Sequence, residues 1–343
     1  MKQWLGIAVF LIAVNSVRAF EITDMANRKV VIEGERLEKI FTSAPSMSYL
    51  ITIFDFGTNA LVGLNSEAKN PTNDGSSYIL GDDFGKQPVL GGWFDNGPQI
   101  APVKLKEMGV QAVFVRKSDP QREKVLIELE EAAIPVIIVD DSMEALPETF
   151  RFMGRLTGRT KKGEAMADWA ETALKSLNAL RAKTADKPLK VFYAGGVEGF
   201  FARCPVPSHD GIFRVLGVEN PPECVQAPER GITPVSFESL QQWDPDVIIT
   251  QNGELPEMAQ NDPLWKSLRA VRNQKFWVVP KTPFNWLDQP SSFMELLGAL
   301  WLGDKLYPRQ ADYNMADEAQ GFFWLAFGTK LRGDAPAKMV SGR

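Results

Sequence analysis

Cationic side chains follow several apolar runs of this sequence. Arg116 comes directly after the run 112–115, Arg203 lies in the segment GFFARC, and Lys281 begins a loop after another run. Guanidinium groups form paired hydrogen bonds with planar anionic groups, so we expect these three residues to bind an anionic ligand. The alternatives are that Arg116 forms an ion pair with Asp119 and that Lys281 is simply solvated.

Aromatic side chains lie on the same kind of loop. Trp93, Phe284 and Trp286 each flank a turn near the carboxyl end of an apolar run, and Phe94 adjoins the first of them. Aromatic rings suit cations and flat ligands, so we expect Trp93, Phe284 and Trp286 to contact the ligand. The alternative is that they cap the edge of a core. Tyr49 is expected to face the core.

The sequence offers few ligands for a bare metal ion. A naked zinc or manganese site needs several converging His, Cys or carboxylate groups, whereas this chain has one histidine, His209, and two cysteines. We therefore expect no resident cofactor and favour a metal already bound by an organic chelator. His209, within PVPSHDG, could complete the coordination of such a metal. Alternatively it hydrogen-bonds to Asp210.

The two cysteines, Cys204 and Cys224, fall in one loop-rich segment. In an oxidising compartment they could form a disulfide that stabilises the fold by about 3 kcal/mol, with two buried free thiols as the alternative.

One long amphipathic helix is predicted between two similar halves. From 160 to 182 apolar residues recur at three- and four-residue steps without proline, which gives a rod of roughly 35 Å. On either side, apolar strands alternate with helices, and the segments LKEMGVQAVFV (105–115) and LQQWDPDVIIT (240–250) have the same order of elements. The alternative is that this likeness has no significance, because any two α/β units resemble each other. We nevertheless predict an α/β fold of two Rossmann-like lobes joined by one α-helix, with a ligand cleft between the lobes.

The first residues have the layout of a secretory signal peptide. Lys2 precedes an apolar run at 5–14, and Val17-Arg18-Ala19 suits cleavage after Ala19. The apolar run is too short to span a bilayer, and no cysteine follows it, so a membrane anchor and a lipoprotein are disfavoured. We expect a monomer in the periplasm. The predicted divisions are a signal peptide (1–19), an N-terminal lobe (20–157), the connecting helix (158–185), a C-terminal lobe (186–331) and a tail (332–343).

Several classes of function are disfavoured. A formal net charge of -5 gives no general reason to bind nucleic acid. No Ser elbow, P-loop or dinucleotide motif is present, and the acidic pairs Asp82-Asp83 and Asp140-Asp141 are expected to be solvated. We therefore predict a binding protein without catalytic activity.

Four stretches carry a resemblance to one family. They are ITDMANRKVVIEGERLEKIFTSAPS, HDGIFRVLGVEN, SFESLQQWDPDVIIT, and PFNW followed by DQPSSFMELLGALWLGDKLYP. In this order they resemble the periplasmic substrate-binding proteins of the iron-siderophore, haem and cobalamin ABC importers, and the likeness covers nearly all of residues 20–331. The resemblance implies two lobes on a long helix, limited hinge motion, and delivery of a metal chelate to an inner-membrane permease.

The resemblance also implies an acidic residue on each lobe that meets arginines of the permease. The aligned position in the second lobe is Arg214, so Glu219 is the nearby candidate, and Asp83 is the candidate on the first lobe. The expected cargo is a ferric siderophore. Alternative cargoes are haem, cobalamin, a nickel chelate or an oxyanion. An alternative from another class is a periplasmic two-lobed enzyme that uses His209 with an aspartate as acid and base.

Overall fold

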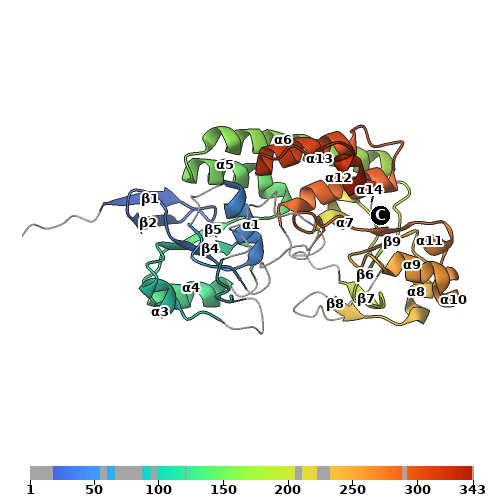
Figure 1. Cartoon of the computed structure of the whole chain (residues 1–343), viewed down its shortest axis with the longest axis horizontal. Helices are drawn as coiled ribbons and strands as arrows, with labels where there is room; N and C mark the ends of the chain where they lie inside the picture. The colour runs from blue at the N-terminus through green and yellow to red at the C-terminus, as the bar shows by residue number, and fades with distance from the viewer. Residues whose placement is uncertain are drawn as a thin grey trace, which may run out of the picture.

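The structure is a computed structural model that describes residues 18–54, 60–65, 87–93, 99–119, 122–204, 211–221, 232–287 and 292–341. Figure 1 shows two lobes, each built on a small sheet, beneath a layer of long helices. The predicted signal peptide falls largely on residues 1–17, which lie outside the described residues. In the part of the chain that the structure describes, no helix is both long enough and apolar enough to cross a bilayer.

The first lobe opens with an antiparallel ribbon and continues with a parallel sheet of order β3-β4-β5. Asn27, with φ of 60°, lies in the turn of the ribbon. Two isolated bridges also form in this lobe, in which Leu61 pairs with Ile40 and Leu64 with Val89. The strands are β1 (Ala19–Thr23), β2 (Lys29–Glu33), β3 (Ile40–Thr42), β4 (Ala112–Arg116) and β5 (Val136–Val139). The helices are α1 (Pro45–Phe54), α3 (Pro102–Glu107) and α4 (Arg122–Glu131).

The predicted connecting helix is confirmed as α6 (Thr160–Thr184), 25 residues without a break. It follows η2 (Met143–Ala145) and α5 (Leu146–Leu156), and α5 packs against it. The two helices cross at glycines, because a Cβ on Gly163 would lie 2.7 Å from the carbonyl oxygen of Phe150. Arg151 on α5 adds ion pairs to Glu164 and Glu171 on α6. These contacts fix the connecting helix to the first lobe.

The second lobe contains a parallel sheet of order β10-β9-β6 and a separate antiparallel pair, β7 and β8. The strands are β6 (Val191–Ala194), β7 (Phe201–Arg203), β8 (Ile232–Pro234), β9 (Val247–Thr250) and β10 (Phe276–Val278). The helices are α7 (Gly211–Leu216), α8 (Phe237–Trp243), α9 (Leu255–Asn261), α10 (Pro263–Lys266) and α11 (Arg269–Arg272).

The internal repeat in the sequence has a structural counterpart. The segment 105–115 ends in β4 and the segment 240–250 ends in β9, and each of these strands is the centre of its parallel sheet. In both sheets the preceding parallel strand lies on one side and the following one on the other. The two lobes therefore share one order of strands, and the predicted α/β fold class is confirmed.

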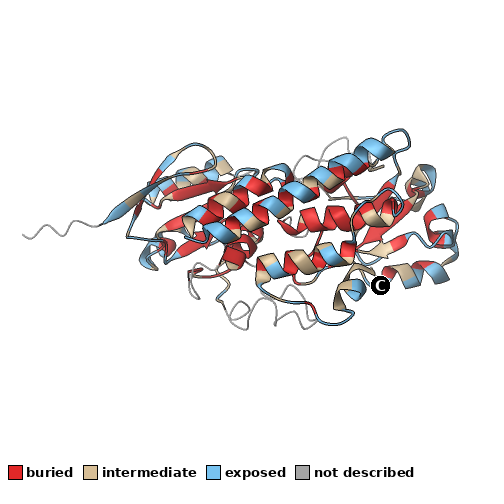
Figure 2. Ribbon diagram, turned by 90° about the horizontal axis from the view of Figure 1, so that it is seen from above, coloured by how far each residue is buried: buried red, intermediate tan, exposed pale blue. Residues whose placement is uncertain are grey.

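One core runs through the helical layer from lobe to lobe. It includes Phe114 and Ile137 of the first sheet, Tyr193 and Ile249 of the second, and the buried stripe of α6. The opposite face of each sheet packs on its own helices in a separate cluster. Three C-terminal helices complete the layer: α12 (Met294–Leu306), α13 (Met315–Phe327) and α14 (Ala335–Ser341). Most residues of α12 and about one side of α13 are buried, whereas α14 has no buried residue. Figure 2 shows that the buried residues, in red, gather toward the middle of the molecule. This core contains residues from before position 157 and from after position 186, so it does not mark where one lobe ends and the next begins. The predicted limits of the lobes stay predictions.

Candidate functional site

The carboxyl ends of the parallel strands form one edge of each sheet, and ligands of open α/β sheets bind beyond that edge. In the first lobe this edge carries Arg116, the last residue of β4. Its Nε lies 2.6 Å from Oδ2 of Asp141, and both side chains are largely buried. Arg116 therefore pairs with an acid beyond the neighbouring strand and not with Asp119, the partner that the sequence suggested.

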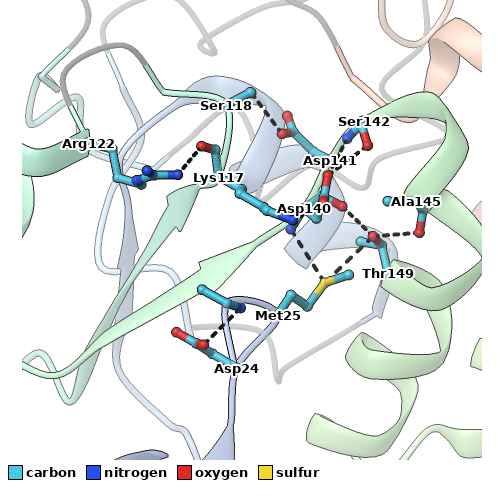
Figure 3. Close-up of polar contacts among 11 residues, drawn as sticks. Asp24, Met25, Lys117, Ser118, Arg122, Asp140, Asp141, Ser142, Ala145 and Thr149 are labelled. Carbon is cyan, nitrogen blue, oxygen red and sulfur yellow. Dashed lines mark hydrogen bonds and ion pairs between the residues drawn. The ribbon is translucent and has the colours of Figure 1, made fainter. Parts of the chain in front are cut away.

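The acidic pair Asp140-Asp141 is held in place by hydrogen bonds, contrary to the expectation that it is solvated. Lys117 Nζ lies 2.7 Å from Oδ2 of Asp140, and the Ser142 hydroxyl donates to Oδ1 of Asp140 at the same distance. Figure 3 shows these contacts, together with the bond from Ser118 to Asp141. They brace the loops that follow β4 and β5.

The protonation of Asp140 follows from these contacts. Burial by itself would raise the pKa of Asp140, but hydrogen bonds from Lys117 and Ser142 and the charge of Lys117 outweigh it and hold the pKa below the usual value. Asp140 is consequently an ionised structural group near neutral pH and is poorly suited to donate a proton.

A buried polar cluster at the start of α1 was not found by the sequence analysis. The Thr42 hydroxyl lies 2.7 Å from that of Ser48 and donates to Oδ1 of Asn65, and Asn65 Nδ2 donates to the carbonyl oxygen of Thr42. Ser43 and Ser46 lie within the same stretch and are also buried. Their hydroxyls have no hydrogen-bond partner among the residues that the structure describes. The only sequence signal was Pro45, a residue favoured at the first position of a helix.

In the second lobe, Arg203 is a buried cation beside the carboxyl end of β6. Only 3% of the residue is exposed, and its guanidinium carbon lies 5.8 Å from the centroid of the Tyr193 ring. The side chain of Asn220 donates to the backbone oxygen of Arg203, which fixes β7 at this point. The lobe thus holds a positive charge in its interior, which is favourable only where the charge is well compensated.

Polar side chains also join the loops that follow β6 and β9. Thr250 donates to the carbonyl oxygen of Ala194 at 2.8 Å, and Asn252 donates to that of Val197 at 3.0 Å. These bonds hold the carboxyl edge of the second sheet in one arrangement. Lys281, beyond β10, is exposed.

The aromatic residues expected to contact a ligand lie in the core instead. Trp93 packs against Phe41 in the first lobe, and its indole nitrogen donates to Glu128. Trp286 is fully buried against α12, so closely that a Cβ on Gly298 would clash with the Trp286 carbonyl oxygen. Trp93 bonds to Glu128 on α4, and Trp286 also packs against Phe323 on α13. These helices come later in the chain, so a loop position gave no sign that the rings would be buried.

Phe284 and Tyr49 form a contact between the two halves of the chain. Their rings are stacked with centroids 3.5 Å apart and an interplanar angle of 13°, and neither residue is appreciably exposed. The expectation that Tyr49 faces the core is confirmed. Phe284 is part of the same core, and its contact with a ligand stays a prediction.

Several predicted residues lie outside the described part of the chain: Asp83, Phe94, His209, Asp210 and Cys224. Cys204 is buried and is not a free thiol. Its pairing with Cys224 stays a prediction. Within the described residues, no group of histidine, cysteine and acidic side chains is arranged to hold a metal ion.

Arg214, the aligned docking position in the second lobe, contacts the first lobe. Arg214 on α7 forms an ion pair with Glu144 in η2 and so joins the second lobe to the first. Glu219 is exposed and pairs through its backbone with Lys190, at the amino end of β6. It therefore lies at the end of the sheet opposite to Thr250.

Comparison with known proteins supplies the family. Residues 112–283, from β4 to the loop after β10, match the periplasmic binding protein family. An ABC transporter solute binding protein from Sulfurospirillum deleyianum is 32% identical, with 93% of this chain and 98% of that chain covered and a TM-score of 0.84. This chain belongs to the periplasmic binding protein family. The resemblance noted in the sequence is thereby confirmed.

Other relatives of this periplasmic binding protein are named for different ligands. The molybdate-binding protein MolA of Haemophilus influenzae is 26% identical over 112 residues, a match that spans 32% of either chain. MolA bound to molybdate has a TM-score of 0.70, with 18% identity and 91% and 99% of the two chains covered. The haem-binding protein RhuT of Roseiflexus has a TM-score of 0.55, with 17% identity and 80% and 99% covered. At these identities the solved structures establish a shared fold only.

Proposed function

We propose that this protein is the periplasmic solute-binding component of an ABC importer, which captures an anionic solute between its lobes and delivers it to an inner-membrane permease. The observation that carries the proposal is the 32% identity to an ABC transporter solute binding protein over almost the whole chain. The two parallel sheets have the same order of strands and are connected by the unbroken helix α6, and this arrangement supports the proposal. The carboxyl edges of two such sheets can enclose one ligand between them.

The chemistry of the described side chains favours binding over catalysis. Asp140 and Asp141 are occupied by Lys117 and Arg116, and the lowered pKa of Asp140 removes it as a proton donor near neutral pH. The rival proposal of an enzyme rests on His209. The variant His209→Ala separates the two, because a binding protein keeps most of its affinity and has no turnover to lose.

The charge of the buried side chains is the main guide to the class of ligand. Since Trp93, Phe284 and Trp286 are used in the core, the aromatic argument for a flat ligand is weakened, whereas Arg203 still provides an interior cation. A ferric siderophore or another anionic metal chelate is one candidate cargo. An oxyanion is the second, favoured by the relationship to a molybdate-binding protein. Haem, cobalamin and a nickel chelate rank below both.

A titration of tryptophan fluorescence tests the proposal, since the chain has nine tryptophans. The protein from Phe20 onward is titrated with molybdate, tungstate, ferric citrate, ferrioxamine, haem, cobalamin and nickel-histidine. We expect saturable binding of at least one anionic compound at one site per chain. Absence of binding by every compound would overturn the proposal.

A charge variant with a matched control locates the site. Arg203→Gln should weaken binding of the anionic ligand at least tenfold. Arg155→Gln, at an exposed position on α5, should leave the affinity unchanged. Far-UV circular dichroism verifies that both variants are folded. Equal affinities in the two variants would remove Arg203 from the site.

A further inference from the structure

The amino end of α1 contains two buried serine hydroxyls without partners. Ser43 is 0% exposed and Ser46 is 2% exposed, and neither hydroxyl has a hydrogen-bond partner within the described part of the chain. The neighbouring hydroxyls of Thr42 and Ser48 are bonded to each other in the same cluster. Buried polar groups normally have partners, so the contrast singles out Ser43 and Ser46.

Both hydroxyls lie at the amino end of a ten-residue helix, Pro45–Phe54. Side chains in a helix tilt toward its amino end, which directs Ser46 back toward Ser43. At the start of the helix, the backbone N–H groups of Met47 and Ser48 donate to the carbonyl oxygen of Ala44. The N–H of Ser46 precedes them and belongs to the first turn, whose donors have no partner within a helix.

The electrostatics of this point favour an anion. A helix amino end carries a partial positive charge and attracts oxyanions, and the first turn of α1 contains no acidic residue. The Ser43 N–H donates to the carbonyl oxygen of Phe114, which places Ser43 beside the end of β4, two residues before Arg116. Asp141 is ion-paired with that arginine, so the negative charge of Asp141 is compensated.

We infer that Ser43, Ser46 and the first turn of α1 form the subsite that binds the negatively charged oxygens of the transported solute. This inference rests on the proposed function and narrows its ligand to one that presents anionic oxygens, as a free tetrahedral oxyanion or as carboxylate groups of a metal chelate. The hydroxyls and the backbone N–H donate to those oxygens, and the helix supplies the charge.

Serine-to-alanine variants give a test that separates binding from folding. The double variant Ser43→Ala, Ser46→Ala removes hydroxyls that make no bond in the free protein, so its melting temperature should equal or exceed that of the unaltered protein. Its affinity should fall at least tenfold for the anion that the protein binds. The control Ser48→Ala, equally buried but bonded to Thr42, should lower the melting temperature and change the affinity far less.

Calorimetric titrations use sodium molybdate as the free oxyanion, ferric citrate as the carboxylate chelate and ferrioxamine B as a cationic chelate. A loss confined to molybdate identifies a free oxyanion as the ligand, and a loss confined to ferric citrate identifies the chelate. Unchanged affinity of the double variant for a bound anion would overturn the inference and leave the proposed function intact. Binding of ferrioxamine B alone would overturn both the inference and the proposed negative charge of the solute, but not the proposed role as a solute-binding component. No binding of any compound would overturn both.

Discussion

Replacement of Phe284 tests whether this ring belongs to the shared core or to the ligand site. Its side chain is fully buried, stacks on Tyr49 and meets Phe293 and Phe327 edge-on or tilted. Truncation of a buried phenylalanine removes its transfer free energy and leaves a cavity, at a cost of about 3–5 kcal/mol. We therefore expect Phe284→Ala to lower the free energy of unfolding by about that amount, a large share of the ~5–15 kcal/mol typical of a folded protein.

The measurement is urea denaturation followed by far-UV circular dichroism, with the midpoint compared at constant slope. Phe284→Leu, which keeps most of the apolar volume, should lose clearly less. Phe201→Ala is the matched control, because that ring is 46% exposed and its removal should cost under about 1 kcal/mol. If Phe284→Ala lost under ~1 kcal/mol while ligand affinity fell, the ring would belong to the ligand site and its assignment to the core would be refuted.

Three further perturbations follow from the contacts described. Gly163→Ala should destabilise the protein by about 1–3 kcal/mol in the same denaturation assay, because its Cβ would meet the Phe150 oxygen at 2.7 Å; full stability would refute the close crossing. Burial alone would raise the pKa of Glu144, but the hydrogen bond and charge of Arg214 outweigh burial and lower the pKa below its ordinary value of 4.5. The ion pair therefore stabilises the folded protein fully above pH 4.5, and this stabilisation is lost as the pH falls through the pKa of Glu144 in the folded protein. Melting temperatures from pH 7 to pH 3 should therefore decline less in Glu144→Gln than in the unaltered protein, and identical declines would contradict the ion pair. Trp93→Phe should reduce stability yet keep ligand affinity within about twofold, and a large loss of affinity at full stability would restore this ring to the ligand site.

The long helix and the repeated sheets could be predicted because their signals are local. The stripe of α6 recurs at the helical period without a proline, and each central strand is a short run that is apolar up to its last residue. Parallel strands buried on both faces give such runs whatever their partners are. The repetition of the same segment predicted two lobes of one design, and the order of strands came from the structure.

The site could be predicted only in part, because the partners of its side chains are distant in sequence. Arg116 was expected to bind the ligand or, alternatively, to pair with Asp119 three residues away. The structure pairs it with Asp141, which follows the neighbouring strand. The burial of Trp286 depends on α12, whose approach is set by Gly298. Ser43 is a common residue type in a loop, and only the packed structure distinguishes it from its bonded neighbours.

A crystal structure of the chain from Phe20 onward, bound to the anion with the highest affinity, would show where the solute binds. We expect electron density for the ligand at the carboxyl edges of the two sheets, with its anionic oxygens within hydrogen-bonding distance of the Ser43 and Ser46 hydroxyls. Density on an outer surface of one lobe, with no contact to α1, would contradict this placement.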